Sequence, residues 1–286
     1  MTTEIKVQPS LLTGARRGTM YRWLLISSVL CWFAILILVP AAALLARALR
    51  GGLGAFLAAL MTPEAISAFS LTLRITALAT ILNTVFGVAF ALVLVRHRFW
   101  GRWLADGLVD LPFAVSPVIA GLMLIVLYGP GGLLGQWFDP LGIRVVYALP
   151  GMVIACLFVT LPFVVREVVP VLRELGDDQE QAAYTLGAGR WTTFWRVTLP
   201  SIRWGVAYGV TLTVARSVGE FGALLVVSGN ILGRTQTATL FVHDQIESSR
   251  PDGAYAASVV LAGFSFVFLI LMEAVRRHVT AREEQS

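Results

Sequence analysis

Two charged side chains, Arg216 and Glu220, interrupt a long apolar segment of the sequence and could act on an ion that crosses a membrane. A charged side chain at the centre of a bilayer costs at least about 2.5–3.5 kcal/mol, so such a residue generally has a partner or a function. At about 100° per residue, both side chains share one helical face with Gly205, Gly209 and Thr213. This face could line a path for an anion. Alternatively, the two charges form an internal ion pair and the small residues allow close helix packing.

Other combinations of reactive side chains are weaker. His243, Asp244 and Glu247 have the spacing of ligands on a helix, but one histidine with two acids is more typical of a solvated surface, and we expect no metal site. No serine–histidine–acid, cysteine–histidine or paired-carboxylate arrangement indicates a catalytic residue. The only lysine is Lys6, and a P-loop requires a lysine, so we expect no cofactor in this chain. Any ATP and magnesium would be bound by a partner chain.

The composition places these residues in a membrane protein. The 286 residues are 57% hydrophobic and 14% charged, with a mean hydropathy of +0.78, whereas a soluble domain has about a quarter of its residues charged. These values exclude a disordered chain, a disulfide scaffold and an ordinary cytosolic enzyme. About 20 apolar residues cross the hydrocarbon core. The sequence predicts an all-α integral membrane protein with six transmembrane helices, at 23–45, 75–95, 108–127, 145–165, 205–227 and 254–272.

The distribution of basic residues predicts that both termini are cytoplasmic. With the N-terminus inside, fifteen arginine and lysine residues fall on the inner side and five on the outer side, in agreement with the positive-inside rule. The net charge of +5 then reflects this topology and contact with anionic lipid, and does not indicate nucleic-acid binding. The first segment could be a cleaved signal peptide, but its apolar run is long for one and favours an uncleaved anchor.

The connection between the fourth and fifth segments, residues 166–204, is long for a connection without a function. An acidic pair can cap a helix near its start, with Glu180 in the first turn, and Gly187 is expected to end that helix. A second short amphipathic piece covers 190–197, and Pro200 suits the first turn of the next span. The pattern predicts a helix–turn–helix that protrudes from the inner face, where it either docks into a partner or lies on lipid.

This loop resembles the inner-loop signature of the permease subunits of ABC importers, E-A-A-x-x-x-G followed by nine residues and I-x-L-P. The matching positions are Gln181, Ala182, Ala183, Gly187, Val197, Leu199 and Pro200. Gln181 replaces the glutamate of the signature and Val197 the isoleucine. Glu180 lies one residue early and would point about 100° around the helix. If the family's glutamate pairs with a basic group on the ATPase, that contact is weaker here or made differently.

Two further segments narrow the resemblance. Residues 111–121 in the third span, and residues 216–223 followed by 226–230, resemble the sulfate and thiosulfate permease group, and within it the CysW type. Molybdate and tungstate permeases share the Gly-Glu-Phe-Gly-Ala element at 219–223, so they are the alternative; the third span favours sulfate or thiosulfate. An ion-coupled secondary transporter is a further alternative, and would need no ATPase.

The resemblance implies a type-I ABC importer permease of MetI-like architecture in the bacterial inner membrane. Its expected parts are an inner tail at 1–22, a first transmembrane helix at 23–45, a permease core at 63–275 with an inner coupling loop at 170–204, and an inner tail at 276–286. The coupling residues fall within 177–200 and include Glu180, and the residues expected to line the translocation path are Ser116, Thr213, Arg216 and Glu220. The implied partners are a second permease subunit, two ATPase subunits, an external sulfate-binding protein and membrane lipid.

Overall fold

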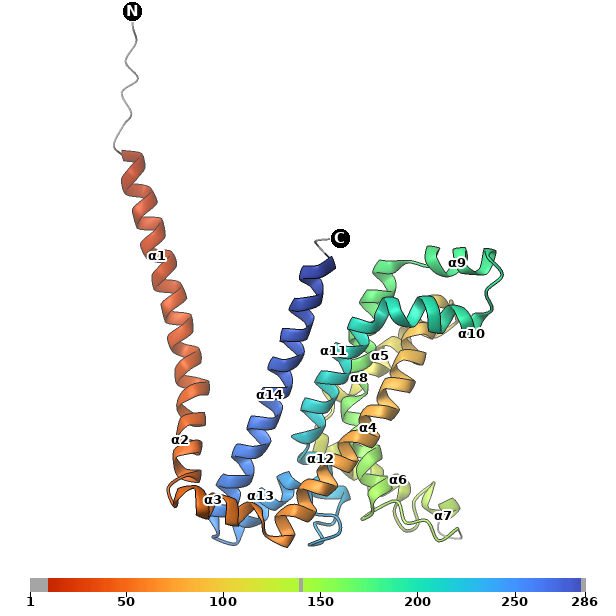
Figure 1. The fold of residues 1–286 in the computed structure, drawn as a ribbon. Coiled ribbons are helices and arrows are strands. Elements are labelled where there is room, and N and C mark those ends of the chain that lie inside the picture. The colour runs from red at the N-terminus through yellow and green to blue at the C-terminus, as the bar shows by residue number, and fades with distance from the viewer. Residues whose placement is uncertain (1–9, 139–140, 284–286) are drawn as a thin grey trace, which may run out of the picture.

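The computed structural model describes residues 10–138 and 141–283, and every regular element in these ranges is a helix (Figure 1). The all-α prediction is therefore confirmed. In chain order the elements are α1 (Ser10–Phe33), η1 (Ala34–Leu38, a π-helical turn), α2 (Val39–Ala48), α3 (Gly52–Leu60), α4 (Pro63–Arg96), α5 (Arg102–Ala114), α6 (Pro117–Tyr128), α7 (Gly135–Phe138), α8 (Leu149–Leu175), α9 (Asp178–Thr185), α10 (Arg190–Thr193), η3 (Phe194–Thr198, also π-helical), α11 (Leu199–Val218), α12 (Gly222–Val227), α13 (Ala238–Glu247) and α14 (Pro251–Glu283).

Four helices are long and apolar enough to cross a membrane: Arg22–Ala48, Pro63–Arg96, Leu149–Leu175 and Pro251–Ala274. The α5–α6 pair adds a fifth span if it is counted as one, although the two helices are bent by 112°. The predicted fifth segment is divided, because α11 ends at Val218 and α12 begins only at Gly222. The six-span count and its orientation in the membrane therefore stay predictions.

The bend between α5 and α6 has a local cause in the sequence. Ser116 precedes Pro117 and has extended dihedral angles, φ −58° and ψ 135°, because a proline disfavours the helical conformation in the residue before it. Val115 is extended as well. Pro117 then occupies the first turn of α6, where its missing N–H leaves no helical bond unmade. The third predicted span is thus two half-helices that meet at Ser116.

The centre of the molecule is a layer of three helices, α4, α8 and α11, that pack at close range. A Cβ atom added at Gly87 of α4 would lie 2.9 Å from Val164 Cβ, and one added at Gly209 of α11 would lie 2.8 Å from Val164 Cα. Small residues allow this close approach of helices in a membrane. The buried Asn83 of α4 adds a polar contact, because its amide donates a 2.7 Å hydrogen bond to the Thr160 hydroxyl of α8.

Gly209→Ala is expected to lower the melting temperature of the detergent-solubilised protein, since the new methyl group meets the α8 backbone at Val164. Overpacking of this kind costs about 1–3 kcal/mol. Gly107→Ala on α5 is the matched control, because nothing lies within 4 Å of its added Cβ and alanine is the better helix former. Equal melting temperatures for the two variants would contradict the close packing of α8 and α11.

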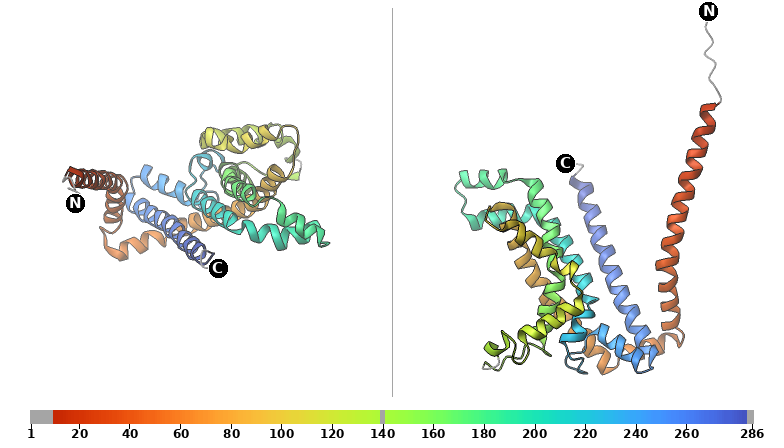
Figure 2. Two further views of the ribbon diagram at one scale, coloured as in Figure 1. Left: turned by 90° about the horizontal axis from the view of Figure 1, so that it is seen from above. Right: turned by 180° about the vertical axis from the view of Figure 1, so that it is seen from behind.

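The first helix stands apart from the others (Figure 2). α2 and α3 contact α14 near one end of the molecule, whereas the apolar side chains between Trp23 and Val39 are largely exposed. The start of α1, the end of α14 and the α9–α10 region lie toward one end, here called the hairpin end, and α3, α7 and α13 lie toward the opposite end (Figure 1). Residues 10–22 and 276–283 of the expected tails extend α1 and α14; residues 1–9 and 284–286 lie outside the described residues.

Candidate functional site

The connection between α8 and α11 is a folded hairpin, as the sequence predicts. It covers residues 176–198 and is therefore shorter than the expected loop. α8 continues to Leu175 and α11 begins at Leu199, so both ends of the expected loop 170–204 belong to the long helices. Gly187 follows α9 with φ +85°, a backbone conformation that L side chains rarely adopt. It turns the chain back toward α10 and η3, which runs directly into α11.

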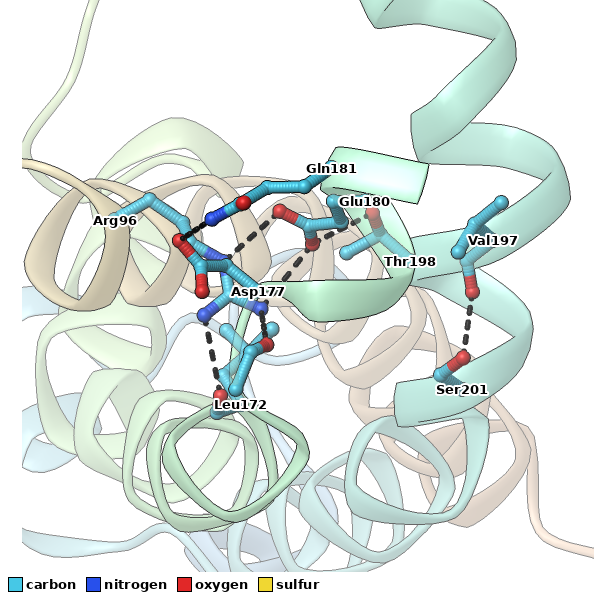
Figure 3. A network of polar contacts seen from close by, with 9 residues as sticks. Arg96, Leu172, Asp177, Glu180, Gln181, Val197, Thr198 and Ser201 are labelled. Carbon is cyan, nitrogen blue, oxygen red and sulfur yellow. Dashed lines mark hydrogen bonds and ion pairs between the residues drawn. The ribbon is translucent and has the colours of Figure 1, made fainter. Parts of the chain in front are cut away.

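Arg96, at the end of α4, holds this hairpin against the central layer (Figure 3). Its Nε lies 3.0 Å from Glu180 Oε2, and its Nη2 donates to Glu180 Oε1 at 3.2 Å and to the Gly176 carbonyl at 2.6 Å. Its Nη1 donates to the Leu172 carbonyl at 3.3 Å, and the Thr198 hydroxyl donates to Glu180 Oε1 at 2.9 Å. We call these five residues the Arg96 network. It joins α4, α8, α9 and η3 at one point.

The network shows where the side chain of Glu180 points, the acid that lies one residue before the glutamate position of the family signature. The Glu180 side chain is only 14% exposed and the Arg96 side chain 18% exposed. The Glu180 carboxylate therefore pairs with a residue of its own chain and points away from solvent. The neighbouring Gln181 is exposed and donates to Asp177 Oδ2 at 2.8 Å. Glu180 and Gln181 therefore lie on different faces of α9, as the helical angle between consecutive residues requires.

The outer surface of the hairpin carries large apolar side chains. Leu186 is 88% exposed and Trp191 is 74% exposed, while Tyr184 and Trp195 are about half exposed. Trp191 and Trp195 contact each other edge to face, with ring centroids 5.7 Å apart. Of the remaining signature residues, Ala182 and Pro200 are exposed, and Ala183 and Leu199 are half-buried. A folded protrusion with exposed apolar side chains has the properties of a docking element.

The predicted path residues are only partly brought together. Arg216 Nη1 lies 2.7 Å from Glu220 Oε2; the arginine side chain is 34% exposed and the glutamate side chain is fully buried. The second carboxylate oxygen of Glu220 accepts the Ala223 N–H at 2.9 Å, so it satisfies an otherwise free donor at the start of α12. Thr213 is buried and its hydroxyl bonds to its own helix at Gly209, 2.8 Å away. Only Arg216 of this face combines charge with exposure.

Ser116 comes from a different element but lies near the same break. It is exposed at the α5–α6 bend, and the following Pro117 packs against the start of α12: a Cβ added at Gly222 would lie 3.0 Å from Pro117 Cβ. A Cβ at Gly121 of α6 would lie 2.7 Å from the Ala223 carbonyl oxygen. The break between α5 and α6 thus packs against the break between α11 and α12. The roles of Ser116, Thr213, Arg216 and Glu220 in a path stay predictions.

The sequence does not predict several of the polar contacts. Arg96 and Thr198 are separated from Glu180 by 84 and 18 residues, and no local spacing connects them. Arg166 of α8 is a second case: it forms ion pairs with Asp106 at 2.7 Å and with Asp110 at 2.6 Å, both on α5. The only signal in the sequence is a charge close to the end of an apolar segment. Its partner becomes visible only in three dimensions.

Arg216→Ala is expected to destabilise the protein by about 3 kcal/mol, because it leaves the buried Glu220 carboxylate without its ionic partner. Adding Glu220→Gln removes that charge and keeps an acceptor for Ala223 N–H, so the double variant should recover much of the melting temperature. Its transport rate, compared with that of Glu220→Gln alone, then reports on Arg216 separately from stability. A double variant that folds and transports normally would assign Arg216 to packing.

Comparison with known proteins shows the family of the chain. Residues 83–282 match the family described as binding-protein-dependent transport system inner membrane component. The chain is 49% identical over 252 residues to the sulfate transport system permease protein CysW of Synechocystis sp., which covers 88% of this chain and 91% of that protein. It is 46% identical over 247 residues to the protein of the same name from Synechococcus elongatus, which covers 86% of each chain.

A solved structure has the same fold. It is the crystal structure of a bacterial alginate ABC transporter in complex with an alginate pentasaccharide-bound periplasmic protein, and its matching chain gives a TM-score of 0.76 at 19% identity. The match covers 94% of this chain and 98% of that one; at this identity the likeness concerns the fold alone. The chain is therefore a multi-pass membrane protein that belongs to the binding-protein-dependent transport system inner membrane components, and within them to the sulfate transport permeases of the CysW type.

Proposed function

We propose that the protein is a membrane-spanning subunit of an ATP-driven importer that carries sulfate or thiosulfate across the bacterial inner membrane. The observation that carries the proposal is the 49% identity to a sulfate transport system permease protein over 88% of the chain. A second permease subunit completes the path, and an external binding protein delivers the anion. This chain hydrolyses nothing itself; ATP and magnesium belong to two partner ATPase subunits.

The hairpin is the surface on which an ATPase subunit docks. Its exposed apolar side chains, Leu186, Trp191 and Trp195, suit insertion into a groove on a partner. Two connections transmit a movement of α9 to the spans. One is the ion pair of Glu180 with Arg96 of α4, and the other is η3, which continues into α11. Both helices belong to the central layer, so a movement of the hairpin displaces the layer instead of bending a loose loop.

The path itself holds the anion only weakly. Arg216 is the exposed charge of its helical face, but the ion pair with Glu220 compensates it. A dianion passing such a site is attracted and then released, which conduction requires. Selectivity for the anion is then set mainly by the external binding protein, before the anion reaches the spans.

The test is uptake of radioactive sulfate into vesicles that contain the purified importer with both permeases, its ATPase and the loaded binding protein. We expect uptake that requires ATP, stops when the ATPase subunit is omitted, and is reduced little by a tenfold excess of molybdate. Uptake driven by an ion gradient without the ATPase would assign the chain to secondary transport. Strong competition by molybdate would move the substrate to the molybdate and tungstate class.

A further inference from the structure

A cavity of about 830 Å³ lies where α6 ends and α8 begins. These two helix ends lie at the opposite end of the molecule from the hairpin (Figure 1). Two segments that are far apart in the sequence form most of its lining: residues 144–147, before α8, and the connection between α12 and α13. Each contributes one arginine, Arg144 and Arg234. The end of α6 adds Tyr128.

Among the residues that the structure describes, none neutralises the two arginines. No acidic side chain is among the lining residues in the described part of the chain. Neither guanidinium has an ion pair or side-chain hydrogen bond to a residue in the described ranges, in contrast to Arg96, Arg166 and Arg216. Both side chains are exposed to the cavity and to solvent. An open cavity with two uncompensated cations attracts anions.

Contacts of Tyr147 hold the end of the segment that carries Arg144. The Tyr147 N–H donates to the Val227 carbonyl at 2.9 Å, which ties the Arg144 segment to the end of α12. The Tyr147 ring also covers Gly229, where an added Cβ would lie 2.8 Å from Tyr147 Cδ1. Tyr147 itself has φ +59°, an uncommon conformation for a bulky residue that surrounding contacts must hold in place.

The Arg234 segment is braced by its own hydrogen bonds. The N–H groups of residues 234, 235 and 236 all donate to the Ile231 carbonyl, at 2.9–3.1 Å. The Ile231 N–H donates to the Thr235 hydroxyl at 3.0 Å, and the Gln236 amide donates to Asn230 Oδ1 at 3.1 Å. A braced loop presents its arginine in a restricted region, so less conformational entropy is lost when an ion binds.

We propose that Arg144 and Arg234 form a receiving site for a tetrahedral oxyanion dianion, at which sulfate is held after it leaves the binding protein and before it enters the spans. This inference rests on the proposed function, which places this end of the molecule outside. Each guanidinium offers planar, paired donors that match two oxygens of such an ion, and the two charges match its double charge. The cavity is wide and open, so the site holds the ion loosely and passes it on.

The experiment uses the complete importer in vesicles and compares the wild type with Arg144→Ala, Arg234→Ala and the double variant. We expect the double variant to lower the maximal rate of sulfate uptake about tenfold or more at saturating loaded binding protein, and each single variant to lower it less. Arg250→Ala is the matched control, because Arg250 is an exposed arginine near the same end and does not line the cavity. It should transport like the wild type.

Three results would overturn the proposal. The first is a double variant that transports as fast as the Arg250→Ala control. The second is a double variant with an unchanged maximal rate that only needs more binding protein, which would assign the arginines to protein docking. The third is a defect that is present in vesicles containing phosphatidylglycerol and absent in pure phosphatidylcholine, which would assign them to lipid phosphate groups. Failure of the proposed function is distinct, because the wild type itself would then not import sulfate.

Discussion

Replacing Gly187 by valine is expected to reduce sulfate uptake by more than about tenfold while the spans remain inserted and the complex remains assembled. Gly187 has φ +85°, where an L residue loses about 1–2 kcal/mol and a β-branched one more. No neighbouring atom lies within 4 Å of an added Cβ, so the cost is conformational and not steric. The chain would relieve it by changing the turn between α9 and α10, which moves the exposed tip of the hairpin away from its docking position.

Gly189→Val is the matched control for this substitution. Gly189 lies two residues further in the same turn, has an ordinary φ of −75°, and also has open space around an added Cβ. Both variants therefore add the same apolar side chain to the same surface, and only one forces a change of backbone conformation. Measured together, they separate altered geometry from altered surface. Equal uptake by the two variants would contradict a role for the Gly187 turn in coupling.

Replacing Arg96 by methionine is expected to uncouple ATP hydrolysis from transport: uptake falls about tenfold, and the ATPase rate no longer depends on loaded binding protein. The substitution leaves Glu180, 14% exposed, without its ionic partner, and removes the bonds to the Leu172 and Gly176 carbonyls. A buried hydrogen bond to a charged group is worth about 1.5–3 kcal/mol. Once the Arg96 network is lost, the hairpin can move without moving α4.

Two further variants make this test specific. Arg98→Met removes an exposed arginine two residues away, near the same end of α4, and should leave uptake unchanged. Glu180→Gln combined with Arg96→Met should cost clearly less than the sum of the two single variants, because residues in one network are not additive. Additive effects, or a defect in Arg98→Met of the same size, would show that the ion pair is not the connection between the hairpin and the spans.

Much of this protein follows from its sequence because hydrophobicity is a local property. An apolar run of span length must lie in lipid or in protein, so the helical class and most of the span positions are set by composition along the chain. Turn chemistry is equally local. Thr62 caps α4 as its side chain accepts the Ala65 N–H, Pro117 starts α6, and Gly187 ends α9 because few other residues adopt its backbone angles.

Contacts between distant residues were decided only by the tertiary structure. The sequence shows Glu180 beside the position where the family signature has its glutamate, but not that Arg96, 84 residues earlier, would hold it inside the molecule. Likewise it shows Arg144 and Arg234 as isolated basic residues, and only the folded chain brings them to one cavity. The physical reason is that a charge can pair with any opposite charge within a few ångströms, and packing of the helices, not spacing along the chain, sets which charges come that close.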